Sequence, residues 1–363
     1  MADCAGQIVA FYLFDIAETI DLAAVPSLIG APGVAARLAP KPTTPAYVQY
    51  EKPPLVFDGD VFGAGDVAGF RPRVRLYNYG VVSIALTREF VGPWTDFTAL
   101  GASFIESADL ERQAEQLCRR VAARVQPALT GVRQEYLSED YLAFALHRID
   151  PPLSSEELVA TRGRDIAALL RGERQPLSDQ EIESVLRHRI SYLANDLVVP
   201  TWNAAFVYDT PVGIQAALEI LEFANSQLLE FRYYDQRLDR ELTAIYARLD
   251  RPRRFDQWRG SHYAREARRV HSLVIDLNEL TDRTENAVKF IGDLYAVRLF
   301  GLTAERLGLA TWKSDVDAKV GTLNEISRFA VEQSSMTRAE FLELAIVLIL
   351  VFELILFFMG VMP

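Results

Sequence analysis

The sequence predicts an α+β N-terminal domain, followed by an α-helical coiled-coil-like stalk and one C-terminal transmembrane helix. Over residues 1–210, β-branched and aromatic runs alternate with helical patterns. Apolar residues then recur at heptad spacing over 211–335, and the chain ends in an apolar run within 336–363. The alternation in the first part fits a ferredoxin-like arrangement, which is the candidate topology. We therefore expect three parts with these bounds, the first of them a cytoplasmic domain.

The strands of the N-terminal domain are predicted from runs rich in Val, Ile, Phe and Tyr. Gly80 is expected to supply the positive φ of a tight hairpin turn. Pro200 cannot donate to a sheet ladder and therefore indicates an edge strand or a bulge. The expected strands are Gln7–Ile16, Ala46–Tyr50, Arg73–Tyr77, Gly80–Leu86, Tyr141–Leu146 and two segments within Ile190–Asp209.

Helix start signals are clear at three serines. Ser107 precedes a helical pattern that extends to Val125, and its hydroxyl is suited to capping the first free amides. Ser154 with Glu157, and Ser178 with Glu181, have the spacing of a capping box. A weaker helical pattern covers Glu18–Ile29.

The predicted stalk contains three heptad stripes. The first runs from Ile214 to Leu249 and is interrupted only by Asp235; the others cover Val270–Leu294 and Leu309–Ala330. Sustained heptads indicate coiled-coil packing, either within one chain or between chains.

The C-terminal run Phe341–Met359 contains no charge except Glu343 and Glu353. A helix of this length spans roughly 28 Å, close to the hydrocarbon thickness of a bilayer. The sequence therefore predicts a tail-anchored membrane protein with its N-terminal bulk in the cytoplasm; a buried core helix is the alternative. A carboxyl group inside a bilayer is costly, so Glu353 is expected to face protein or a water-filled path. Asp235, Glu343 and Glu353 are together the predicted oligomer seam, and an ion path through Glu353 is the alternative.

A cluster of arginines stands out in a chain of net charge −11. If the three stripes run up, down and up, this cluster lies beside the predicted anchor, where it would contact lipid headgroups. A solvated hairpin tip and RNA are the alternatives, and the acidic net charge argues against nucleic acid as a partner. The predicted membrane-surface residues are Arg251, Arg253, Arg254, Arg259, Arg265, Arg268 and Arg269.

No motif with catalytic or metal-binding spacing is present. The acidic turn at Asp58 and Asp60 lacks the ligand positions of a calcium loop, and the four histidines are scattered along the chain. We therefore expect no enzymatic activity, no cofactor and no metal site.

Three segments and a shorter strand motif, in this order, resemble one known family. They are YNYGVVSIAL at Tyr77–Leu86, then Ser191–Thr210, Leu221–Leu242 and Leu309–Ala330. The sequence is similar here to the family of proteins required for meiotic nuclear division (domain of unknown function 155). The resemblance implies a membrane-anchored, self-associating protein with no established enzymatic activity. The lack of a transit peptide favours a bacterial member, located at the inner membrane.

These observations predict a homo-oligomeric membrane scaffold or tether, which holds an unidentified cytoplasmic protein at the lipid surface. The alternatives are an enzyme with an unrecognised site in the α+β domain, and an ion-conducting oligomer that uses Glu353.

Overall fold

The computed structural model describes residues 3–35, 53–65, 69–105, 107–249, 275 and 294–358. The expected strand at Ala46–Tyr50 and nearly all of the second heptad stripe lie outside these ranges. The chain forms two compact units. The first, called here the α/β unit, comprises Met1–Tyr233 and Thr284–Trp312; the second, the helical unit, comprises Tyr234–Arg283 and Lys313–Pro363.

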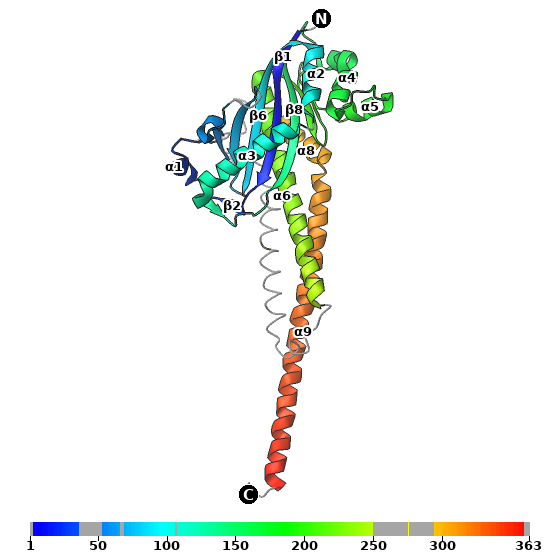
Figure 1. Cartoon of the computed structure of the whole chain (residues 1–363). Helices are drawn as coiled ribbons and strands as arrows, with labels where there is room; N and C mark the ends of the chain where they lie inside the picture. The colour runs from blue at the N-terminus through cyan, green and yellow to red at the C-terminus, as the bar shows by residue number, and fades with distance from the viewer. Residues whose placement is uncertain are drawn as a thin grey trace. The chain divides into compact units, whose positions relative to one another are not determined.

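An eight-stranded sheet forms the centre of the α/β unit, in the order β3-β4-β5-β6-β1-β8-β10-β9 (Figure 1). All neighbouring strands are antiparallel except β8 and β10. A separate two-stranded sheet pairs β2 with β7. The strands are β1 Asp3–Asp15, β2 Thr19–Ile20, β3 Val34–Ala35, β4 Leu55–Asp58, β5 Arg71–Leu76, β6 Val81–Pro93, β7 Leu129–Thr130, β8 Leu137–Asp150, β9 Leu197–Pro200 and β10 Ala204–Tyr208.

This sheet corrects the ferredoxin-like expectation, because the fold is a mixed α/β architecture on a much larger sheet. Two features account for the difference. Strand β6 continues through the more polar segment Thr87–Pro93, where side chains are partly exposed and the apolar pattern fades. Strand β10 then joins β8 in parallel, which requires a long crossover connection; helices α4, Ser155–Arg171, and α5, Asp179–Arg187, lie in this connection.

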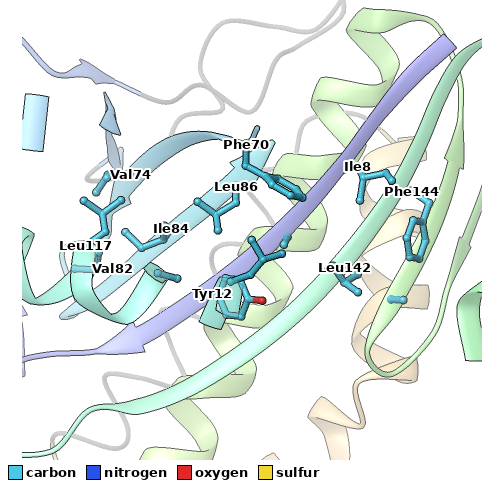
Figure 2. Close-up of a cluster of buried hydrophobic side chains, with 14 of the residues drawn as sticks. Ile8, Tyr12, Phe70, Val74, Val82, Ile84, Leu86, Leu117, Leu142 and Phe144 are labelled. Carbon is cyan, nitrogen blue, oxygen red and sulfur yellow. The ribbon is translucent and has the colours of Figure 1, made fainter. Parts of the chain in front are cut away.

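One face of the sheet is strongly apolar and is covered by helices α2 and α3, which lie between β6 and β8 in the sequence. Successive side chains of a strand alternate between faces, so Ile8, Ala10 and Tyr12 share this face with Ile84 of β6 and Phe144 of β8. Figure 2 shows part of this core. The elements of this part of the chain are α1 Val25–Ile29, η1 Gly59–Phe62, α2 Trp94–Phe104, α3 Ala108–Val125, η2 Gln126–Ala128, α4 Ser155–Arg171 and α5 Asp179–Arg187.

The opposite face has small side chains at Ala85, Ala143 and Ala205, which allow close approach of a helix. Residues 211–233 of helix α6, Pro211–Leu249, lie against this face, with α8, Leu294–Arg306, also on this side (Figure 1). Residues 217–231 of α6 are all buried, so this part of the helix is enclosed on every side. A helix enclosed in this way is a core element rather than one strand of a solvent-exposed stalk.

Several local predictions are confirmed. Gly80 has φ 92° in the turn before β6, and β9 with Pro200 is an edge strand. Ser154 and Glu157 form a complete capping box, and Ser178 accepts a hydrogen bond from the Glu181 amide. Ser107 is the N-cap of α3, but its hydroxyl makes no capping hydrogen bond.

Helix α9, Leu309–Phe358, continues without a break for 50 residues. Within the described part of the chain, no helix is both long and apolar enough to cross a membrane. The predicted transmembrane helix, and with it the single-pass location at a bacterial inner membrane, is therefore wrong. Glu343 and Glu353 divide the C-terminal run and leave nine uncharged residues, Leu344–Phe352, between them. Nine helical residues span about 14 Å, roughly half of a bilayer's hydrocarbon core.

Candidate functional site

Asp235, a residue of the predicted seam, has a partner within its own chain. In the helical unit, Lys319 Nζ of α9 lies 2.7 Å from Asp235 Oδ1 and 2.7 Å from Asp239 Oδ1. Leu238 and Ile245 of α6, and Val316 and Leu323 of α9, are buried at seven-residue spacing in this unit. The heptad interruption at Asp235 is therefore occupied by an ion pair between two helices of one chain.

The other two predicted seam residues lie in α9. Glu353 is exposed, and Glu343 lies in the helix with a side chain outside the described set. Between them is a run of aliphatic residues, Ile346–Val351, whose side chains are 48% to 59% exposed. We call these six residues the aliphatic segment. An uninterrupted exposed aliphatic surface of this kind marks an interaction site.

The arginine cluster between Arg251 and Arg269 lies outside the described residues. The predicted headgroup contact also depended on a membrane-spanning helix beside the cluster. The ion-conducting alternative through Glu353 required the same helix. Both ideas stay untested expectations, and the membrane-spanning helix that each assumed is not found in the described ranges.

A buried ion network that sequence reasoning missed joins the sheet to α6. Arg75 of β5 has only 3% of its side chain exposed, and its Nε lies 3.2 Å from Glu222 Oε2. Its guanidinium also lies 3.6 Å from Glu219 Oε1. We call these three residues the Arg75 network. Burial raises the pKa of Glu219, and the nearby Glu222 raises it further, while Arg75 and a hydrogen bond from Gln215 oppose this change.

Further polar contacts follow along α6. The Tyr79 hydroxyl lies 2.7 Å from Ser226 Oγ and accepts a hydrogen bond from Gln227 Nε2 at 3.2 Å. About one and a half turns later, Arg232 forms an ion pair with Glu139 of β8. Because each contact requires one particular pairing of helix and strand positions, together they fix the axial position of α6 on the sheet.

Arg133 makes a further contact between the sheet and α6, at the end of β1 and beside Tyr233. Its Nε donates to Asp15 Oδ2 at 3.1 Å, and its guanidinium lies 3.8 Å from the ring centroid of Tyr233. Asp15 is fully buried at the end of β1. Burial raises the pKa of Asp15 to about 6, although Arg133 acts in the opposite direction.

The chemistry of this interface is that of a structural clamp. Arg75 and Arg133 each face carboxylates, and no nucleophile-and-base pair occurs among the contacts described above. Within the described ranges, no group of three His, Cys, Asp or Glu side chains is arranged to hold a metal ion. In the sequence, Glu219 and Glu222 fall between the apolar positions of the first heptad stripe, where charged residues ordinarily face solvent, so the pattern does not single them out.

Fold and interface together define a mixed α/β protein, in which a large sheet is clamped to a long helix by buried charges. The chain belongs to the family defined by the N-terminal domain of uncharacterized protein MJ0711, whose model matches residues 5–215. The uncharacterized protein MJ0711 of Methanocaldococcus jannaschii is 23% identical over 194 residues. That alignment covers 53% of this chain and 58% of the archaeal protein, so the chain spans less than two thirds of its curated relative. No solved structure matches the chain.

This family assignment overturns the resemblance to the proteins required for meiotic nuclear division, and the expected bacterial origin has no support. Two of the segments behind that resemblance, Leu221–Leu242 and Leu309–Ala330, lie beyond the matched residues 5–215. Both are helical segments with heptad-spaced apolar residues, and helix packing imposes the same Leu and Ala periodicity on unrelated chains. Short matches of this kind therefore carry little family information.

Proposed function

We propose that the protein is a self-associating scaffold, in which the aliphatic segment of α9 joins copies of the chain and the α/β unit presents a surface to a protein partner. The observation behind the proposal is the exposure of six consecutive aliphatic side chains, Ile346–Val351, in one uninterrupted helix. Every copy carries the same segment, so a second copy supplies a matching apolar surface.

The sequence around the segment gives a register for such a contact. Leu344, Leu348, Val351, Ile355 and Phe358 recur at alternating spacings of four and three residues, the pattern of a coiled-coil seam. In that register, Glu343 and Glu353 fall at outer heptad positions and stay in water. A helix pair in this register therefore buries Leu348 and Val351 of the aliphatic segment, with Val347 at the edge of the contact, and buries neither carboxylate.

The energy available indicates association that depends on concentration. Complete burial of an aliphatic side chain contributes roughly 1.5–3 kcal/mol, and a side chain that is already half covered gains about 1 kcal/mol. Leu348 and Val351 of two copies together gain on the order of 4 kcal/mol, and the neighbouring seam positions add to this, so the total is comparable to the lower range of the entropic cost of association. We therefore expect the oligomer to dissociate on dilution.

Light scattering after size-exclusion chromatography tests this proposal on the full chain, whose monomer mass is 40.8 kDa. The wild type should show at least twice that mass at high concentration and a lower mass on dilution. The variant Leu348→Gln with Val351→Gln should remain monomeric.

A matched control makes the same kind of change elsewhere. Val34 and Val212 are 70% and 72% exposed in the α/β unit, so Val34→Gln with Val212→Gln should assemble as the wild type does. A monomeric wild type at every concentration, or an α9 variant that assembles like the control, would contradict the proposal.

A further inference from the structure

A cavity of about 280 Å³ lies in the α/β unit beside the start of α3. Its walls come from four elements that the fold brings together: strands β1 and β8, the end of α2 and the first turn of α3. Tyr12 of β1 and Asp140 of β8 are directly opposite each other in the antiparallel register. Both therefore project from the face of the sheet that α2 and α3 cover.

The Tyr12 hydroxyl faces this cavity without a partner. Tyr12 is 7% exposed, and its hydroxyl makes no hydrogen bond to the described chain. Figure 2 shows its oxygen on the apolar face, near Leu142 of the neighbouring strand. Burial raises the pKa of Tyr12, and the carboxylates of Asp140 and Glu111 raise it further, so the phenol keeps its proton. The hydroxyl is therefore available to exchange a hydrogen bond with a ligand atom in the cavity.

Two carboxylates line the more exposed side of the cavity. Glu111 comes from α3 and Asp140 from β8, and neither forms an ion pair within the described residues. Burial raises the pKa of Asp140, although Arg232 lowers it. A cationic group placed between these two carboxylates would relieve their repulsion and the cost of partial burial.

The first turn of α3 lines another part of the cavity and favours a negatively charged group there, in contrast to the two carboxylates. Ser107 and Ala108, the N-cap and first residue of this 18-residue helix, line the cavity. The Ser107 hydroxyl makes no capping bond, so the free amides of the first turn remain available to a negatively charged or acceptor group. Phe104, Ala10 and Leu142 complete the lining with apolar surface.

We propose that this cavity binds a small zwitterion, a free α-amino acid with an apolar side chain. Its carboxylate lies at the first turn of α3 and the Ser107 hydroxyl, and its ammonium group lies between Glu111 and Asp140. The Tyr12 hydroxyl hydrogen-bonds one of the two charged groups, and the apolar side chain contacts Phe104 and Leu142. The volume suits a ligand of this size rather than a nucleotide or a larger cofactor. This inference is independent of self-association through α9.

Isothermal titration calorimetry of the full chain with L-leucine and L-phenylalanine tests the proposal. At least one of them should bind. The paired analogues 3-methylbutylamine and 4-methylpentanoate, which lack the carboxylate and the ammonium group of leucine, should bind at least 10-fold more weakly than leucine or not at all. Absence of binding by both amino acids, or equal binding of leucine and one analogue, would overturn the proposal.

Three variants locate the binding site. Tyr12→Phe removes only the hydroxyl and should weaken binding about 3- to 10-fold, the range of a single hydrogen bond. Asp140→Asn should weaken binding at least 10-fold. Asp109→Asn is the control, because Asp109 lies in the same helical turn, pairs with Arg112 and does not line the cavity. Circular dichroism checks that the variants are folded; unchanged affinity in both folded cavity variants would place the ligand elsewhere.

Discussion

Replacing Arg75 by methionine tests the structural role of the Arg75 network. The substitution keeps an unbranched apolar stem in β5 and removes the guanidinium that faces Glu219 and Glu222. Both carboxylates are then left in an environment where their side chains are only 9% and 2% exposed. Removing one partner of a buried ion pair costs about 3–5 kcal/mol, because the remaining charge stays buried without compensation. A domain's whole stability is about 5–15 kcal/mol, so the expected loss is a large fraction of it.

Urea denaturation of the full chain measures this loss through the fluorescence of buried Trp94, which lies in the same unit. Arg71→Met is the matched control, because Arg71 is in the same strand but is exposed; its change should stay within about 0.5 kcal/mol. The triple variant Arg75→Met, Glu219→Gln, Glu222→Gln should recover more than half of the loss, since no unpaired charge remains. If Arg75→Met is as stable as Arg71→Met, the network does not hold α6 on the sheet.

Three further predictions concern the same unit. Burial raises the pKa of Asp15 from 3.8 to about 6, although Arg133 opposes this change. Folding therefore favours the protonated carboxyl group. Its contribution to the free energy of unfolding is complete below about pH 4 and is lost as the pH rises through 6. Urea denaturation between pH 4 and 7 should show that the free energy of unfolding falls by up to about 3 kcal/mol less in Asp15→Asn than in the wild type. If the variant loses as much stability over this pH range as the wild type, Asp15 is not the group that titrates. Gly80→Ala should lower the free energy of unfolding by more than about 3 kcal/mol, because φ is 92° and the new Cβ would lie 1.8 Å from the Ala17 carbonyl oxygen. Gly301→Ala is the control, because its Cβ meets open space in α8; thermal denaturation should show that it is neutral or stabilising. Ser154→Ala breaks the capping box of α4 and should cost about 1 kcal/mol, whereas Ser103→Ala, outside any N-cap, should cost less in the same measurement.

Features set by local chemistry were predictable from the sequence. The turn at Gly80 and the N-caps at Ser154 and Ser178 each depend on a few neighbouring residues, and the structure contains them. The size of the sheet was not predictable in this way, because β3 and β4 join it through pairings such as Leu55 with Leu76 that no short segment encodes. Helix α2 was also missed, since it follows β6 directly and includes Gly101, a poor helix former.

The candidate sites show the same division. Arg75 and Glu222 are far apart in sequence, and only the folded sheet brings them together. Tyr12 and Asp140 are opposed for the same reason, through the register of β1 and β8. The aliphatic segment was visible from the sequence, but its composition alone does not distinguish contact with lipid from contact with another protein chain. The spacing of Glu343 and Glu353 was the available signal against a membrane-spanning helix.

The order in which the α/β unit is assembled from the chain has a consequence for its synthesis on the ribosome. Its sequence is interrupted after Tyr233 and resumes only at Thr284, so α8 is translated roughly 60 residues after the buried part of α6. At 5–20 residues per second, this interval lasts about 3–12 s. Phe223 of α6, whose ring centroid lies 5.6 Å from that of Phe300 in the completed unit, lacks this neighbour throughout the interval. The side of the core helix that α8 covers in the completed unit therefore stays without α8 for seconds after its own synthesis.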